Sequence, residues 1–360
     1  MRFRPFFLLL LSVLLSASLV GCDLLESDEN GSAPATGIYI ANGGGFGNQN
    51  SSLTIYDPET RSSQTLPADG SGFSSYIQSL TLRGDQLFVV FGETSTVDIY
   101  TPETGSQSGQ ISGIPNPRYV ATNDETAYIT SQDYGPDPSD LDVVDLSTNT
   151  VVDSVNVNGT PEDVAVADGR VVVALGGFNA GSSVALVSPS DLSVETLDVG
   201  CTGPRSLVTD AENEVHVFCT GRAPSENSEG IPGEVVTIDP SESSVMGSTE
   251  LSTQIASESL AQYVTYSAAA EEAHAILANS ELLRFDTATN SVADRIDVSG
   301  APVGAVAYSP STQRLFVGRL AASGNPFSTP GTVTIHERDG TALDTLAAGV
   351  APSHIAVERE

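Results

Sequence analysis

The segment Ala351-Pro352-Ser353-His354-Ile355-Ala356-Val357 lies at the end of the chain and decides the fold, because it repeats a pattern that is used several times upstream. The pattern is a proline, two variable residues and a short apolar run, and its other copies begin at Pro117, Pro161, Pro204 and Pro302. No remainder of a repeat follows the last copy, whereas the first repeat, from Gly37, lacks this opening segment. We therefore expect the terminal segment to return to the first repeat and supply its missing strand.

Two further apolar segments recur seven times after residue 37, separated by turn residues. The more regular of the two ends in a turn of the Asp-Pro-Glu-Thr type, as in Leu53-Thr54-Ile55-Tyr56-Asp57-Pro58-Glu59-Thr60, where proline presets φ and aspartate caps its own backbone. Its copies are spaced by 43 to 51 residues, the length of a four-stranded propeller blade. No window sustains a capped helical period. The sequence thus predicts an all-β, seven-bladed β-propeller in which the C-terminal strand supplies the first strand of blade 1.

The start of the chain has the anatomy of a bacterial export signal. Arg2 and Arg4 precede an apolar run, and Leu19-Val20-Gly21-Cys22 resembles the lipoprotein cleavage box, which implies that Cys22 becomes the lipidated first residue. Ordinary secretory cleavage is the alternative. We expect a signal peptide over 1–21, a lipidated cysteine with an acidic flexible tether over 22–36, and the propeller over 37–360.

The tether also suggests where in the cell the protein is located. Its run Glu26-Ser27-Asp28-Glu29 resembles the acidic surface-export signal of Bacteroidetes lipoproteins. This resemblance implies an outer-membrane lipoprotein, at the cell surface or alternatively at the periplasmic face. The lipid anchor is the only membrane contact that we expect.

The chain is strongly acidic. It has 46 acidic residues against 14 basic ones, and every basic residue is arginine. Loss of Arg2 and Arg4 with the signal would leave 46 acidic residues and 12 arginines, a net charge of −34. Such a surface excludes nucleic acid as a partner, because phosphates require a basic surface. We interpret the charge as adaptation to high salt; a surface that collects cations or repels acidic ligands is the alternative.

Two cysteines remain after Cys22. Cys201 lies just before the first strand of one repeat and Cys219 at the end of its second strand, so antiparallel pairing would bring them close together. An exported protein permits a disulfide here, but spacing alone does not decide whether the bond forms.

Function is expected on one face of the propeller. The connections that precede the first strand and those between the second and third strands emerge on the same face of a blade, and here they are variable and carry aromatic and arginine side chains. Such residues around a mouth would form a binding surface. Alternatively, the glycines serve tight turns and the aromatics fold over the blade ends. The candidate ligand-binding residues are Phe46, Asn48, Tyr76, Arg118, Tyr134, Phe178, Arg205, Arg222, Phe327 and His354.

A family resemblance suggests the cargo. Tyr39-Ile40-Ala41-Asn42 resembles the Tyr-Val-Thr-Asn repeat of exported bacterial propellers. The stretch that follows is similar to the opening blade of seven-bladed Bacteroidetes surface lipoproteins that include vitamin B12 binders, although Gly43 replaces an acidic residue. The matching residues are Asn42, Gly44, Phe46, Gly47, Asn50, Ser52, Leu53, Tyr56 and Asp57. This resemblance implies a protein that captures a small molecule such as a corrinoid for a TonB-dependent outer-membrane transporter. Apart from any transporter complex, we expect a monomer.

Signatures of catalysis are scarce. The sequence contains no Cys-x-x-Cys-His, His-Glu-x-x-His or Gly-x-Ser-x-Gly motif, and its four histidines are isolated, so we expect neither a catalytic residue nor a metal. Asp133, Asp137, Asp140 and Asp142 could supply oxygens to calcium, but they lack the EF-hand spacing, and no cofactor is expected. This pattern favours binding over catalysis. A propeller enzyme, of the lactonase or quinone-dependent dehydrogenase type, and a scaffold or adhesion protein are the alternatives.

Overall fold

The computed structural model describes residues 37–123, 125–132, 140–177, 180–226, 228–257 and 262–357. The predicted signal peptide, Cys22, the tether, Tyr134 and Phe178 lie outside these residues. The described part of the chain consists of strands and connections. It contains no helix that is long and apolar enough to cross a bilayer.

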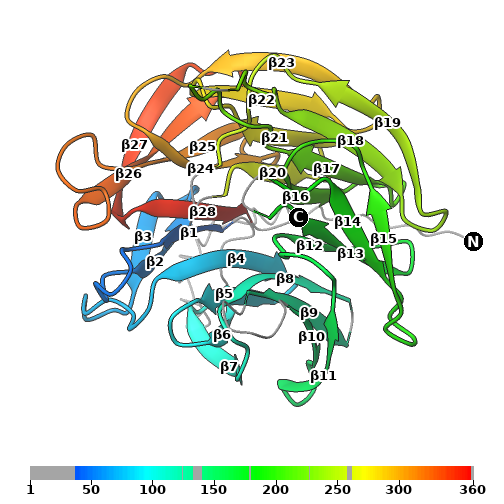
Figure 1. Cartoon of the computed structure of the whole chain (residues 1–360). Coiled ribbons are helices and arrows are strands. Elements are labelled where there is room, and N and C mark those ends of the chain that lie inside the picture. Colours follow the sequence, from blue (N-terminus) through cyan, green and yellow to red (C-terminus); the bar gives the residue numbers. More distant parts are fainter. Residues whose placement is uncertain are drawn as a thin grey trace, which may run out of the picture. The chain divides into compact units, whose positions relative to one another are not determined.

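Seven antiparallel sheets of four strands each make up the propeller (Figure 1). The first, inner strands are β28 (Pro352–Val357), β4 (Ile77–Arg83), β8 (Pro117–Thr122), β12 (Val164–Ala167), β16 (Pro204–Thr209), β20 (Val264–Ser267) and β24 (Val303–Ser309). The second strands are β1 (Ile38–Asn42), β5 (Gln86–Phe91), β9 (Thr126–Ser131), β13 (Arg170–Leu175), β17 (Val215–Cys219), β21 (Glu272–Ile276) and β25 (Arg314–Arg319).

The outer half of each blade is built in the same order. The third strands are β2 (Ser52–Asp57), β6 (Thr96–Thr101), β10 (Asp140–Asp145), β14 (Ser183–Val187), β18 (Glu234–Asp239), β22 (Glu281–Asp286) and β26 (Pro330–Glu337). The fourth strands are β3 (Ser62–Leu66), β7 (Ser106–Ser112), β11 (Thr150–Asn156), β15 (Val194–Asp198), β19 (Ser244–Glu250), β23 (Ser291–Asp297) and β27 (Ala342–Val350).

The C-terminal strand closes the ring. β28 pairs antiparallel with β1, in a register that places Ile355 opposite Ile40 and His354 opposite Ala41, and Figure 1 shows the two strands side by side. Ile355 packs in one core cluster with Ile40 of blade 1 and Phe316 of blade 7. The seven blades and the closing strand that the sequence predicts are confirmed.

The second strands are almost entirely buried, the first strands β16 and β20 are only partly buried, and the fourth strands are the most exposed. Every residue of β1, β17 and β21 is buried, whereas β3 and β11 are mostly exposed. The second strands are buried because both faces of each blade pack against its neighbours. Outer strands lie at the rim, where polar side chains remain in water and leave the sheet edge less apolar.

A bulge recurs at the start of the first strand, where the proline pattern begins. The pairing with the second strand shifts by an extra residue after Ile77, Pro117, Pro204 and Val303. A bulge bends the strand and re-aims the side chain beside it. Here it directs the residue that follows the proline position, such as Gln78 or Arg118, toward the neighbouring blade.

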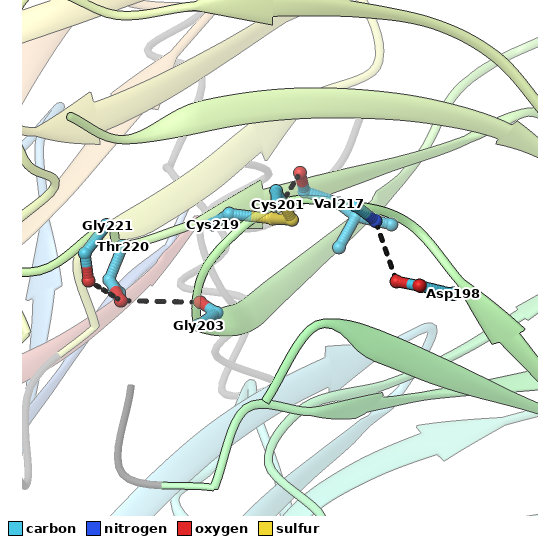
Figure 2. The surroundings of a disulfide bond; sticks show 8 residues. Asp198, Cys201, Gly203, Val217, Cys219, Thr220 and Gly221 are labelled. Carbon is cyan, nitrogen blue, oxygen red and sulfur yellow. Dashed lines mark hydrogen bonds between the residues drawn. A yellow bond between two sulfur atoms is a disulfide. The ribbon is translucent and has the colours of Figure 1, made fainter. Parts of the chain in front are cut away.

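Cys201 and Cys219 form a disulfide. Their Cα atoms are 6.1 Å apart, and the bond links the end of β17 to the segment before β16, as Figure 2 shows. Both residues are buried in the same apolar cluster as Val217. The bond closes a loop within blade 5, because the cysteines are 18 residues apart.

Removal of this disulfide should lower stability measurably. We expect the double substitution Cys201→Ala/Cys219→Ala to lower the free energy of unfolding by about 3 kcal/mol, the magnitude for a loop of this length. Urea unfolding of the variant and of the original protein, each with and without reductant, measures the effect. Reductant should shift the midpoint of the original protein alone; an unchanged midpoint would contradict the prediction.

Candidate functional site

The connections between second and third strands lie against the entries to the first strands. The backbone amide of Ile77 donates to Gly43 O at 3.1 Å, and the amide of Thr220 donates to Gly203 O at 2.9 Å. Likewise, the backbone amide of Leu320 donates to Pro302 O at 2.8 Å. These hydrogen bonds place both kinds of connection on one end of the blades, which we call the loop face.

The glycine-rich loop after β1 has a fixed conformation. Gly44 and Gly47 have φ values of +73° and +70°, which glycine adopts without a steric penalty. The amide of Gly45 donates to Asn50 Oδ1 at 2.9 Å, and the amide of Gly47 donates to Glu93 Oε1 of blade 2 at 3.0 Å. The loop is therefore held both by itself and by the neighbouring blade.

A loop from blade 7 meets this one. Asn48 Nδ2 and Asn50 Nδ2 both donate to the backbone carbonyl of Phe327, at 3.3 and 3.0 Å. A Cβ atom on Gly45 would lie 2.6 Å from the same carbonyl oxygen, so the approach requires glycine there. The contact ties together residues that are 277 to 279 positions apart in the sequence.

Two aromatic side chains stand on this tied loop pair. Phe46 is 77% exposed and Phe327 is 41% exposed. The ring of Phe46 contacts the ring of Tyr76, with a distance of 6.0 Å between their centroids. We call Phe46 and Phe327 the aromatic platform. An exposed aromatic pair on a rigid backbone is typical of a binding surface, because little entropy is lost when a ligand covers it.

A hollow lies elsewhere on the loop face, between blades 5, 6 and 7. Its volume is about 310 Å³, and its walls include Thr220, Ile255, Tyr263, Leu277 and Val303. The hollow offers a mixed polar and apolar surface to a ligand that reaches beyond the platform.

The structure distributes the other predicted residues differently. Arg222 is exposed and donates to Ser228 Oγ at 3.3 Å, and Arg205 is half-buried. Tyr76, Arg118 and His354 are buried, so these three side chains are not exposed on the loop face. The bulges of the first strands explain the difference for Arg118, because they turn its side chain between blades.

Arg118 instead belongs to a buried ion pair between blades. Its guanidinium donates to Glu162 Oε2 of blade 4 at 2.7 Å and to Gln78 Oε1 of blade 2 at 3.2 Å. Sequence reasoning missed Glu162, although a signal existed. Pro161-Glu162 and Pro117-Arg118 occupy the same position in adjacent repeats with opposite charges.

Residues 36–217 match the model of the family described as "Domain of unknown function (DUF5074)". The chain belongs to the DUF5074 family. No curated protein matches the chain.

Solved structures that resemble this DUF5074 propeller share its fold at low sequence identity. A functionally unknown protein from Desulfotomaculum acetoxidans is 11% identical, with a TM-score of 0.63 over 89% of this chain and 98% of that one. Hydrazine synthase from Kuenenia stuttgartiensis is 14% identical, with a TM-score of 0.60 over 77% and 88%. The propeller domain of Cps50 (Swd1) from Myceliophteria thermophila is 13% identical, with a TM-score of 0.57 over 76% and 87%. Their range of names shows that the fold alone does not decide the function.

One group in the described part of this DUF5074 chain has side chains spaced like metal ligands. The ligand atoms of Asp210, Glu214 and His216 lie within 4.8 Å of one another. However, His216 already has Asp210 Oδ2 at 2.9 Å and Thr237 Oγ1 at 3.1 Å on its two ring nitrogens. Thr237 in turn donates to Asn290 of blade 6 at 2.9 Å. We interpret the group as a structural network between blades.

Only one of the four candidate calcium ligands has a side chain that the structure describes. Asp133 and Asp137 and the side chain of Asp140 lie outside the described residues. Asp142 is buried in β10.

Proposed function

We propose that this chain is an exported, lipid-anchored propeller whose loop face captures a small-molecule cargo. The observation that carries the proposal is the aromatic platform, because Phe46 is exposed at the tip of a loop that hydrogen bonds fix on both sides. Water contact with a large apolar side chain is unfavourable, and burial of one such side chain contributes about 1.5–3 kcal/mol. A fixed loop cannot withdraw the ring, so a ligand that covers it gains this free energy.

A corrinoid is the first candidate for the cargo. The resemblance of residues 42–57 to the vitamin B12-binding lipoproteins suggests this class, and the platform and the hollow suit a large, partly apolar molecule. In this proposal the lipid on Cys22 holds the propeller at the outer membrane, and the loop face presents the cargo to a TonB-dependent transporter.

Loss of the platform should weaken binding without weakening the fold. We expect Phe46→Ala to raise the Kd for cyanocobalamin about 30-fold, which corresponds to about 2 kcal/mol for a central contact. Phe327→Ala should have an effect in the same direction. Isothermal titration of the purified protein measures the affinity, and urea unfolding should show an unchanged midpoint for Phe46→Ala.

A matched control is available on the rim. Val152 of β11 is 60% exposed and lies on an outer strand, so Val152→Ala removes exposed apolar surface away from the loop face. It should leave the Kd unchanged. If Phe46→Ala and Val152→Ala have equal affinities, the platform is not the binding surface. If the original protein binds no corrinoid, the cargo is wrong.

A further inference from the structure

The network around His216 in blade 5 has a mismatch between its hydrogen-bonding groups. His216 is fully buried, with Nδ1 3.1 Å from Thr237 Oγ1 and Nε2 2.9 Å from Asp210 Oδ2. Thr237 donates its only hydroxyl proton to Asn290 Oδ1 of blade 6, at 2.9 Å. Thr237 Oγ1 therefore accepts from His216, which places the ring proton on Nδ1.

This tautomer sets one acceptor opposite another. The neutral ring carries a single proton, so Nε2 of His216 presents a lone pair to the carboxylate oxygen of Asp210. Two buried acceptors at 2.9 Å require a cation between them, either an additional proton or a metal ion. The residues around the pair decide between these two.

Glu214 favours the metal ion. Its carboxylate is half-buried and reaches the same point, because one ligand atom from each of Asp210, Glu214 and His216 lies within 4.8 Å of the other two. A proton bridges only two atoms, whereas a divalent ion binds three or more. An ion with ligands at about 2.1 Å holds neighbouring ligand atoms about 3.0–3.4 Å apart, so a rotation of the Glu214 side chain would complete the site.

The charges of the group also suit a divalent cation. Two carboxylates and a neutral imidazole carry two negative charges, which one divalent ion balances and one proton does not. Burial raises the pKa of Tyr266, and the charges of Asp210 and Glu271 raise it further. Negative charge therefore surrounds the group and attracts a cation.

The neighbouring residues hold the ligand atoms in place. Asp210 Oδ1 accepts from the amides of Glu212 and Glu214, at 3.0 and 2.9 Å, which leaves Oδ2 directed at His216. Thr237 holds the other ring nitrogen, as partners of metal-binding histidines do. An imidazole ligand favours zinc and other transition metals over calcium and magnesium, which prefer oxygen ligands alone.

We propose that Asp210 Oδ2, the Glu214 carboxylate and His216 Nε2 bind a divalent transition-metal ion such as Zn²⁺, with water at the remaining positions. The ligands lie in and just after the turn between β16 and β17, whereas the loop face holds the connection that follows β17. The site is therefore at the other end of the blade from the aromatic platform, and it does not depend on the cargo of the loop face.

Nitrogen NMR of the full protein labelled with ¹⁵N-histidine tests the tautomer and the metal together. After removal of metal by a chelator, the ring of His216 should carry a proton on Nδ1, and added Zn²⁺ should shift Nε2 saturably. His336 of blade 7 is the internal control and should not shift, because its nitrogens lie beside Gly340 O and Thr334 Oγ1. A neutral ring with its proton on Nε2 alone, or no shift with Zn²⁺, would overturn the proposal.

Two variants of the same turn separate this site from the acidic surface. Glu214→Gln removes one ligand with little change in size and should raise the Kd for Zn²⁺ by more than about 10-fold. Glu212→Gln removes the same charge from an exposed neighbour and should leave the Kd nearly unchanged. Isothermal titration in concentrated salt with excess Mg²⁺ measures both, because these conditions suppress binding at the surface. Equal affinities in the two variants would show an adventitious ion only and would overturn the proposal.

Crystals soaked in Zn²⁺, with data collected at the zinc absorption edge, provide the second readout. An anomalous peak at about 2.0–2.2 Å from all three ligand atoms supports the proposal. Peaks on the acidic surface alone, with none at His216, would overturn it.

Discussion

A protein that ends at Val350 is expected to have no cooperative native state. The truncation removes β28, which pairs with β1 along five residue pairs. It leaves the buried strand β1 with an open edge and removes Ile355 from the cluster that joins blade 7 to blade 1. Loss of one buried isoleucine side chain alone costs about 2–5 kcal/mol. Loss of the whole strand should exceed the roughly 5–15 kcal/mol that stabilises a domain.

Thermal unfolding followed by circular dichroism, together with size-exclusion chromatography, measures this loss. The truncated protein should show no sharp transition and should aggregate through the open edge of β1. A protein that ends at Val357 keeps the whole of β28 and is the control, which should unfold like the complete chain. A truncated protein that unfolds at the original temperature would show that the ring does not need its closing strand.

The second large effect is expected at the buried ion pair. Glu162→Ala should lower the free energy of unfolding by roughly 3–5 kcal/mol, because it leaves the Arg118 guanidinium buried without its counter-charge. Both side chains are nearly inaccessible, and their charged atoms are 2.7 Å apart. Urea unfolding at neutral pH measures the difference.

Blade 7 supplies a matched control for this prediction. Arg314 and Glu337 are also 2.6 Å apart, but their side chains are 34% and 40% exposed. Solvent screens such a pair, so Glu337→Ala should cost less than about 1 kcal/mol. Equal losses in the two variants would contradict the role assigned to burial. In the double variant Arg118→Met/Glu162→Ala, most of the stability should return, since neither charge of the buried pair remains.

The inner and middle strands were predictable because packing dictates their residues. Several second strands are apolar on both faces, as in β5, which is buried between blades. The outer strands β3 and β11 could not be recognised from an apolar pattern, because their side chains are mostly exposed and can be polar without loss of packing. Two inner strands, β4 and β20, lack the proline that marks the other copies.

The candidate site was predicted only in part. Phe46 and Phe327 lie on the loop face as exposed side chains, because glycines and asparagines around them fix the loops. The positions of Arg118 and His354 depend on bulges and on contacts with adjacent blades, which a pattern within one repeat does not encode. Glu93, which accepts from Gly47, was missed for the same reason, since its partner lies in another blade.

Hydrogen–deuterium exchange of the complete protein, alone and saturated with cyanocobalamin, tests the central claim most directly. If the loop face captures the cargo, exchange should slow at residues 43–51 and 320–329 and remain unchanged on the outer strands β7 and β19. Saturable binding that protects only the outer strands, or no binding at all, would contradict the claim.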